Sequence, residues 1–154
     1  MGQLDVNEVI QQVVSLTRHE LVRGGITVQM DLIPEVPAVF GDRVQLQQVV
    51  LNLIMNAIDA MAANQGVTRK LLIKSVGVPE GVLIQVEDSG KGFDNLQAER
   101  FFEPFFTTKP QGIGMGLSIS RSIVEAHGGR IWVTLASPQG AVFQFVLPKA
   151  KSPA

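Results

Sequence analysis

The chain has 154 residues, of which 45% are hydrophobic and 18% charged, and its formal net charge is −1. This composition is typical of one globular domain with its own core, and the near-neutral charge excludes broad nucleic-acid binding, which needs a basic face. The absence of cysteine excludes disulfides and thiolate chemistry and favours a cytoplasmic location. No apolar run approaches the roughly 18 residues of a membrane-spanning helix, so we expect no direct membrane contact. A charged n-region followed by an apolar h-region is also missing, so we expect no signal peptide.

The first half of the chain predicts a helix, a strand and a second helix. Asp5 is a typical N-cap, and apolar residues then follow helical spacing until Gly24 and Gly25 end the helix. Residues 26–32 alternate with a period of two, which indicates a strand with one buried face. A long helix with one wide apolar face begins at Asp42.

The second half predicts four strands and a third helix. Strands are expected at 71–76 and 82–86, a helix at 116–127, and a hairpin of 131–135 with 142–147. Residues 94–111 carry little periodicity and indicate a long loop, with a short helix at 97–101.

Helices and strands are interleaved, and several neighbouring strands are close enough in sequence to pair antiparallel. This order predicts an α+β fold: a two-layer sandwich in which a mixed sheet of about five strands is covered on one face by three helices. Residues 1–150 would form this domain. The end of the chain is expected to be disordered from Lys149 onward, and residues 151–154 are assigned to a disordered tail outside the domain.

A polar stripe runs along the helix that begins at Asp42. Asn52, Asn56 and Asp59 fall within roughly 60° of one another, almost opposite the apolar face. A solvated helix surface would explain such a stripe, but asparagine is a poor helix former and occurs here twice at i, i+4. Amide oxygens are hard, neutral ligands that suit Mg²⁺, so the stripe is also a candidate metal site.

Asp88 follows a strand and is followed by two glycines, Gly90 and Gly92. A carboxylate at this point can accept a hydrogen bond from an exocyclic amine, and glycines allow the backbone to approach a flat base closely. In isolation, the same residues more often form an ordinary turn between a strand and a loop.

Three further glycines, Gly112, Gly114 and Gly116, lead directly into the third helix. Backbone N–H groups at a helix start, free of side chains, can hold phosphate with help from the helix dipole. The spacing matches neither the dinucleotide-binding fingerprint nor the P-loop.

Half of the eight phenylalanines lie at 101, 102, 105 and 106, inside the long loop. Such a cluster usually anchors a loop on the core, although it can also close over a ligand or dock on a partner. Thr107, Thr108 and Lys109 follow, and a lysine beside phosphate would supply a compact positive charge.

The two histidines carry weaker signals. His19 precedes Glu20 as in a phosphoacceptor motif, but Gly24 and Gly25 replace the usual continuation, so we expect an ordinary, partly exposed helix residue. His127 is expected near a helix C-terminus, where the dipole favours it. With two histidines and no cysteine, a zinc site is not expected.

Taken in this order, four segments resemble the conserved boxes of the histidine-kinase catalytic domain, a member of the GHKL superfamily. Residues 52–59 resemble the N box, 88–93 the first glycine box, 102–109 the F box and 112–117 the second glycine box. The resemblance covers nearly the whole chain. It implies the Bergerat fold, with an ATP lid. Because the lid segment, about residues 94–111, is long and weakly periodic, we expect it to order when nucleotide binds.

The resemblance also implies Mg²⁺ and ATP as ligands. Asn56 would coordinate Mg²⁺ with support from Asn52, both acting in catalysis, and Asp88 would bind the adenine amino group. The residues that it assigns to ATP are Asn52, Asn56, Asp59, Asp88, Gly90, Gly92, Phe93, Thr107, Thr108, Lys109, Gly112, Ile113, Gly114, Met115, Gly116 and Leu117.

Within this fold, ATPases such as DNA gyrase carry a glutamate one helical turn before the metal-binding asparagine, as general base on water. Asn52 occupies that position here, which favours phosphoryl transfer to a histidine on a separate dimerisation and phosphoacceptor domain, and thence to a response regulator. The isolated domain is expected to be monomeric. Two alternatives stay open: a serine kinase of the anti-sigma-factor type, and a nucleotide-binding regulatory module without catalysis.

Overall fold

A computed structural model describes residues 1–62, 68–90, 92, 100–103, 116–136 and 139–150. The elements, in chain order, are β1 (Gly2–Leu4), α1 (Val6–Leu16), α2 (Arg18–Arg23), β2 (Ile26–Leu32), β3 (Val39–Gly41), α3 (Arg43–Ala62), β4 (Arg69–Val78), β5 (Gly81–Asp88), α5 (Gly116–Ala126), β6 (Arg130–Leu135) and β7 (Ala141–Pro148). Within the described part, no helix is long and apolar enough to cross a membrane.

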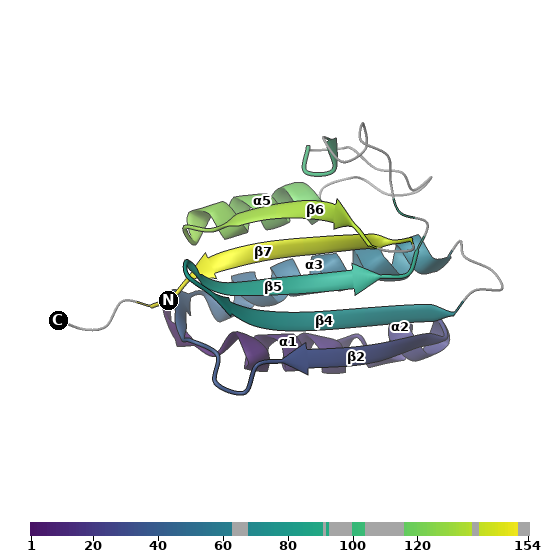
Figure 1. Ribbon diagram of the computed structural model, residues 1–154, viewed down its shortest axis with the longest axis horizontal. Helices are drawn as coiled ribbons and strands as arrows, with labels where there is room; N and C mark the ends of the chain where they lie inside the picture. Colours follow the sequence, from purple (N-terminus) through teal and green to yellow (C-terminus); the bar gives the residue numbers. More distant parts are fainter. Residues whose placement is uncertain (63–67, 91, 93–99, 104–115, 137–138, 151–154) are drawn as a thin grey trace.

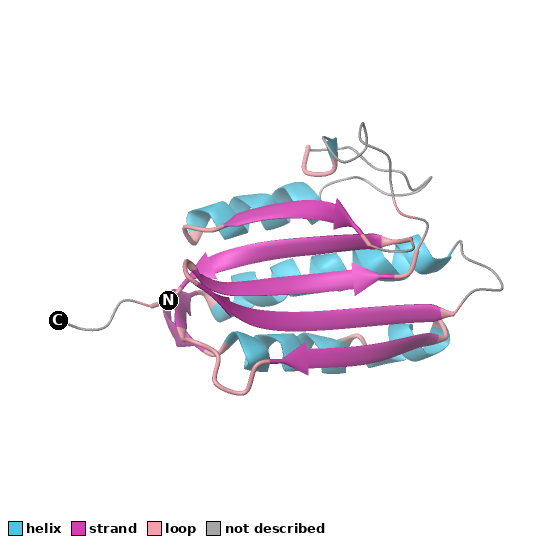
Figure 2. Cartoon of the chain, in the orientation of Figure 1, coloured by secondary structure: helices cyan, strands magenta, loops and turns pink. Residues whose placement is uncertain are grey.

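The main sheet has five strands in the order β2-β4-β5-β7-β6. The β2–β4 pair is parallel and the other pairs are antiparallel, so the sheet is mixed. The described helices lie together behind this sheet, as Figure 2 shows. The predicted two-layer α+β sandwich is therefore confirmed. A small second sheet of β1 and β3 was not predicted, because three-residue strands give too short a pattern to recognise.

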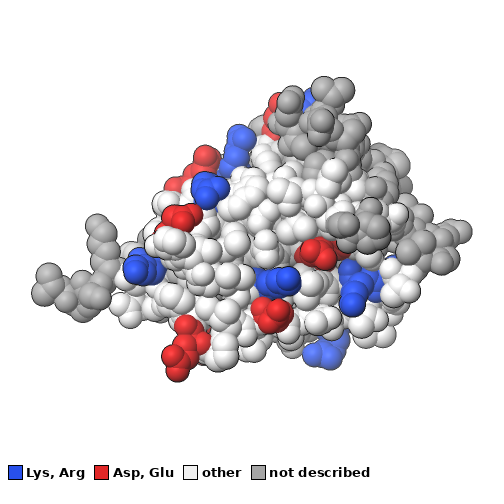
Figure 3. Space-filling model, viewed as in Figure 1, with Lys and Arg blue, Asp and Glu red and all other residues white. Residues whose placement is uncertain are grey.

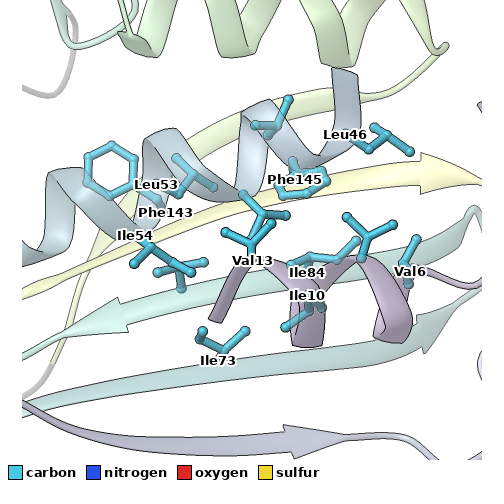
Figure 4. Close-up of a cluster of buried hydrophobic side chains, with 14 of the residues drawn as sticks. Val6, Ile10, Val13, Leu46, Leu53, Ile54, Ile73, Ile84, Phe143 and Phe145 are labelled. Carbon is cyan, nitrogen blue, oxygen red and sulfur yellow. The ribbon is translucent and has the colours of Figure 1, made fainter. Parts of the chain in front are cut away.

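The core lies between the helices and the inward side of the sheet (Figure 4). Ile10 and Val13 of α1 and Leu53 and Ile54 of α3 are at most 1% exposed, and they pack with buried residues of the strands. The helical period of the apolar residues in α3 and the two-residue period in β5 therefore bring one apolar side of each element into the same layer.

The first predicted helix is interrupted, and this expectation was wrong in one respect. Asp5 caps α1 by accepting a hydrogen bond from the Asn7 backbone N–H at 2.8 Å, as expected. The chain then leaves helical geometry at Thr17, which separates α1 from α2. The buried Thr17 hydroxyl donates a hydrogen bond at 2.9 Å to the carbonyl oxygen of Val13, which lies in the preceding turn of α1.

Two further expectations concern the C-terminal end of the chain and the strand at the edge of the sheet. The expected disorder from Lys149 onward was wrong for Lys149 and Ala150. Lys149 forms a β-bridge with Val39, and the Ala150 N–H donates to Ala38 O at 2.7 Å. The expected tail at 151–154 lies outside the described residues. Strand β2 buries only Ile26 well, since it is the edge strand of the sheet.

The sheet face without helices is mainly uncharged, as Figure 3 shows from the same side as Figure 1. A row of amides and a hydroxyl crosses part of this face. Gln85 donates to Gln144 at 2.9 Å, and Gln144 donates to Thr134 at 3.1 Å. These bonds join β5, β7 and β6 and satisfy polar groups that neighbouring side chains cover.

Candidate functional site

Helix α3 is the central element of the candidate site. Asn52 and Asn56 are half-buried and Asp59 is exposed, whereas Leu53 and Ala57 are buried in the core. The predicted stripe therefore faces away from the hydrophobic layer. The chemical roles of these three polar residues stay predictions.

Asn52 joins α3 to the start of α5. Its Nδ2 donates to Gly116 O and to Ser120 Oγ, both at 3.0 Å, and its Oδ1 accepts a hydrogen bond from Gln48 at 2.7 Å. Both N–H groups of the amide are thus used within the protein. By contrast, no hydrogen bond joins the Asn56 amide to another residue in the described ranges, so Asn56 is the more available of the two for a ligand.

Asp88 ends β5 and is only 2% exposed. Its Oδ1 accepts hydrogen bonds from the backbone N–H of Gly90 at 2.8 Å and of Ala141 at 3.3 Å. Its Oδ2 is buried and has no hydrogen-bond partner among the described residues. A buried, unpaired carboxylate oxygen is costly, and a bound ligand that donates an N–H to it would remove this cost.

Burial raises the pKa of the Asp88 carboxyl above its ordinary value of 3.8. The N–H groups of Gly90 and Ala141 act in the opposite direction, because they stabilise the charged form, and the nearby carboxylate of Glu87 raises the pKa further. The desolvation of one oxygen thus outweighs two hydrogen bonds to the other. Perturbed carboxyl groups of this kind are typical of ligand sites.

The two glycines after Asp88 are explained by close backbone contacts. A Cβ atom on Gly90 would lie 2.9 Å from the carbonyl oxygen of Ala60 in α3, which is too close for any other residue. Gly92 has φ +78°, and a Cβ there would lie 3.3 Å from Gly140 O. The loop after β5 therefore lies directly against α3 on one side and against the β6–β7 connection on the other.

Ser89 fixes the same loop from a third direction, and sequence reasoning did not single it out. Its Oγ accepts a hydrogen bond from the Lys70 backbone N–H at 2.9 Å and donates to Thr68 O at 3.0 Å. Both partners lie at the beginning of β4, which is the neighbour of β5 in the sheet. A serine between Asp88 and Gly90 reads as ordinary turn chemistry in sequence, so nothing in the pattern revealed this contact.

Several predicted site residues lie outside the described residues. They are Phe93, Thr107, Thr108, Lys109, Gly112, Ile113, Gly114 and Met115. Most of the expected lid and of the short helix at 97–101 falls there too. Gly116 and Leu117 are described and begin α5. A Cβ on Gly116 would meet Asn52 at an ordinary 3.7 Å, so packing against α3 alone does not require glycine at this position.

The expected anchoring of the phenylalanine cluster is confirmed for two rings. Phe101 and Phe102 both make edge-to-face contacts with Phe143 of β7, with ring centroids 5.6 and 6.2 Å apart. Phe102 is 9% exposed and belongs to the core. These contacts fix one point of the long segment between β5 and α5 on the sheet.

The histidines have different surroundings. His19 is exposed on α2, as expected. His127 follows the last residue of α5 and is 9% exposed. Its Nε2 accepts a hydrogen bond from the Asp42 backbone N–H at 3.1 Å, so its Nδ1 carries the proton that is donated to Ile123 O at 2.8 Å. Sequence reasoning missed the contact with Asp42, because the two residues are 85 positions apart.

The donor set fits an adenine nucleotide with a divalent cation. Asp88 offers a buried acceptor, the adjacent glycine backbone can approach a flat base, and Asn56 offers a neutral amide oxygen. Among the described residues, no three histidine or acidic side chains are grouped to hold a metal ion by themselves. A cation here would thus take most of its ligands from phosphate and water, as Mg²⁺ commonly does.

Comparison with known proteins gives one consistent family. Residues 41–151 match the family described as histidine kinase-, DNA gyrase B- and HSP90-like ATPases. The chain is 41% identical over 146 residues to the sensor protein TdiS of Thauera aromatica. The aligned region covers 94% of this chain and 27% of that protein. The chain thus spans little more than a quarter of that relative's length.

Solved structures agree with this match. The catalytic domain of histidine kinase ThkA superposes with a TM-score of 0.85 at 37% identity, covering 96% of this chain and 94% of that domain. Full-length ShkA, solved in complex with AMPPNP, superposes with a TM-score of 0.85 at 28% identity, covering 99% of this chain and 32% of that protein.

Proposed function

Because this chain belongs to the family of histidine kinase-, DNA gyrase B- and HSP90-like ATPases, we propose that it is the catalytic, ATP-binding domain of a sensor histidine kinase. It binds Mg²⁺-ATP and transfers the γ-phosphoryl group to a histidine on a separate dimerisation and phosphoacceptor domain. The observation that carries the proposal is the buried Oδ2 of Asp88, which has no hydrogen-bond partner among the residues that the structure describes and lies beside Gly90 and Gly92. The AMPPNP complex of the similar protein ShkA supports a nucleotide ligand.

Adenine recognition rests on Asp88. Oδ1 is held by the N–H groups of Gly90 and Ala141, which leaves Oδ2 to accept a hydrogen bond from the exocyclic amine of adenine. Guanine presents a carbonyl oxygen at the equivalent ring position, and two acceptors facing each other repel. The site should therefore prefer ATP to GTP.

The phosphates would lie between α3 and the start of α5. Asn56 would supply an amide oxygen to Mg²⁺, which neutralises developing charge on the transferred phosphoryl group. The backbone N–H groups at the start of α5, where Gly116 and Leu117 lie, would bind phosphate oxygens together with the predicted glycines at 112 and 114. Thr107, Thr108 and Lys109 stay proposed phosphate contacts from the lid, and Asp59 a proposed contact at the rim.

Transfer to a protein histidine is favoured over hydrolysis. A hydrolase needs a general base one turn before the metal-binding residue, and Asn52 cannot take a proton at neutral pH. Its amide is also fully engaged as a donor to α5. Intrinsic ATP hydrolysis by this domain is therefore expected to be very slow.

The acceptor histidine lies on another domain in this proposal. His19 is on the short helix α2 and lacks the sequence context of a phosphoacceptor, and His127 is buried with both ring nitrogens in hydrogen bonds. The phosphoryl group would then pass from the acceptor domain to a response regulator. We place the domain, residues 1–150, in the cytoplasm as a monomer.

The proposal is tested with ATP labelled at the γ-phosphate and two added acceptors. One is a helical histidine domain from a sensor kinase, and the other is a serine-bearing substrate of an anti-sigma-factor kinase. Acid-labile label on the histidine domain supports the proposal, and the Asp88→Asn variant should give less of this label at the same ATP concentration. Acid-stable label on serine would favour the serine kinase. Nucleotide binding without transfer to either acceptor would favour a regulatory module, and rapid release of free phosphate a hydrolase.

A further inference from the structure

Helix α5 is attached to α3 at both of its ends by side-chain hydrogen bonds. At the start of α5, Asn52 donates to Gly116 O and to Ser120 Oγ. At its end, the His127 ring accepts a hydrogen bond from the Asp42 backbone N–H. Asp42 and Asn52 are ten residues apart, and Gly116 and His127 are eleven apart, which corresponds to about 15 and 16 Å of helix. The two attachments therefore match in spacing and fix α5 antiparallel to α3.

Ser120 is the least expected member of this arrangement. Its side chain is 0% exposed, although serine is usually found near the surface. Its hydroxyl donates to Gly116 O at 2.9 Å and accepts from Asn52 Nδ2 at 3.0 Å, so every partner belongs to one small cluster. The carbonyl of Gly116 is thereby bound by two side chains, one from its own helix and one from α3.

The orientation of the Asn52 amide is also fixed. Gln48, one turn earlier in α3, donates to Asn52 Oδ1 at 2.7 Å, which turns the Nδ2 group of Asn52 towards α5. Gln48 is exposed, whereas Ser120 is buried. The bonds thus form a chain from the surface of α3 through Asn52 to Ser120 and Gly116 in the first turn of α5.

The other end of α5 is held with little freedom to move. A Cβ on Gly41 would lie 2.7 Å from Cδ2 of the His127 ring, so the ring packs directly on the backbone that precedes α3. The bonds of Ser120 and Asn52 hold the opposite end of α5 against α3.

We infer that Ser120 is a positioning residue that, through Asn52, sets the place of the first turn of α5, whose backbone N–H groups face the triphosphate. This inference rests on the proposed function, since that function puts phosphate at the start of α5. Ser120 touches no ligand itself. A misplacement of about 1 Å in a binding group can weaken binding or catalysis strongly, so a buried hydroxyl that fixes one helical turn has a clear physical role.

The test compares Ser120→Ala with three other variants. Ser120→Thr keeps the hydroxyl. Ser122→Ala removes an exposed hydroxyl from the same helix. Gln48→Ala removes the hydrogen bond to Asn52 Oδ1 through a change at an exposed position of α3. Gln45→Ala, at another exposed position of the same helix, is its matched control. Circular dichroism establishes that each variant is folded before two properties are measured: amide hydrogen exchange without nucleotide, and the affinities for Mg²⁺-ATP and for adenosine.

In Ser120→Ala, we expect faster exchange in the first turn of α5 and unchanged exchange in the central strands. Affinity for Mg²⁺-ATP should fall about fivefold, which is the size expected for one lost hydrogen bond, while affinity for adenosine stays within about twofold. Gln48→Ala should change both properties in the same direction but less. Ser122→Ala and Gln45→Ala should behave as the wild type, and Ser120→Thr, which keeps the hydroxyl but adds a buried methyl group, should stay closer to the wild type than Ser120→Ala.

Unchanged exchange in both Ser120→Ala and Gln48→Ala would overturn the inference, whether or not the wild type binds ATP. Equal losses of ATP and adenosine affinity would also overturn it, because they would indicate general destabilisation. If the wild type binds no nucleotide at all, the proposed function fails, and the phosphate role of Ser120 fails with it.

Discussion

The backbone N–H of Ala141 donates a hydrogen bond to Oδ1 of Asp88 across 3.3 Å, which connects the start of β7 to the last residue of β5. Together with the Gly90 N–H at 2.8 Å, this bond fixes one carboxylate oxygen, while the other, Oδ2, is buried and has no partner within the described part of the chain. The sheet therefore holds Asp88 in an orientation that a ligand N–H can complete.

Asp88→Asn should weaken ATP binding and reduce the preference for ATP over GTP. The amide can still accept from Gly90 and Ala141 through its oxygen, but it then presents an NH₂ group to the adenine amine, and two donors face each other. The expected loss is ~1–3 kcal/mol of binding free energy, measured by isothermal titration calorimetry. Asp31→Asn, at an exposed position of β2, is the matched control. Unaltered affinity and selectivity in Asp88→Asn would remove Asp88 from the adenine site.

The pKa of Asp88 should lie above 3.8 in the free protein and fall when adenosine binds, because a donor to Oδ2 stabilises the carboxylate. A carboxyl group whose pKa is raised by folding contributes most stability below its unfolded pKa and loses that contribution as pH rises through the folded value. Denaturant unfolding of the free protein and of Asp88→Asn, from pH 3.5 upwards in ~0.5-unit steps, compares the two free energies of unfolding. We expect the wild type to lose stability relative to the variant as pH increases. A relative gain would contradict the burial argument.

Gly140→Ala should destabilise the fold and weaken nucleotide binding. Gly140 has φ +113°, and a Cβ there would lie 2.0 Å from Asp88 O, so the backbone where β5 meets the following loop must move. Strain of this kind costs about 1–3 kcal/mol, which thermal or denaturant unfolding can detect. Gly77→Ala is the control, since its Cβ would make only an ordinary 3.7 Å contact with Ile33. Equal stability of the two variants would show that the β6–β7 connection adapts freely.

Asn56→Ala should leave the fold intact and abolish the Mg²⁺ dependence of ATP binding. The side chain faces away from the core and has no hydrogen bond to another described residue, so its loss costs the protein little. Circular dichroism tests the fold, and calorimetry with and without Mg²⁺ tests the metal role. Gln45→Ala, at an exposed position of α3, should keep the Mg²⁺ dependence. An unfolded Asn56→Ala protein would instead make Asn56 a structural residue.

Asn52→Glu should lower ATP affinity without creating an efficient ATPase. In sequence alone, this change restores the general base of the related hydrolases. In the structure, however, a carboxylate has no N–H to donate, and it would face the carbonyl oxygen of Gly116. Asn52→Gln keeps the donors and should bind ATP more tightly than Asn52→Glu. A coupled assay of phosphate release measures turnover, and a large increase in Asn52→Glu would show that a general base at this position matters more than the hydrogen bonds of Asn52 to Gly116 and Ser120.

Most of the fold was predictable from periodicity, because each element's pattern is strong over its own length. The apolar face of α3 extends over 20 residues, and the alternation in β4 extends over ten. Strand β5 has eight residues and pairs with β4, which directly precedes it in the chain. The break at Thr17 was not predictable, since the apolar residues keep roughly helical spacing on both sides of it; there the buried Thr17 hydroxyl bonds to carbonyls of the preceding turn. The order of Lys149 and Ala150 was not predictable either. It depends on contacts with Val39 and Ala38, more than a hundred residues earlier in the chain, which the local pattern does not show.

By itself, the sequence determined which residues are candidates: the polar stripe at Asn52 and Asn56, the carboxylate of Asp88 and the glycines near it. It could do so because side-chain chemistry and local spacing are written in the chain. Only the tertiary structure decided how they are used. The N–H of Ala141 binds one oxygen of the buried Asp88, and the other oxygen has no partner among the described residues. The buried Ser120 hydroxyl accepts a hydrogen bond from Asn52. Both results depend on packing between distant segments, and a local pattern contains no information about such contacts.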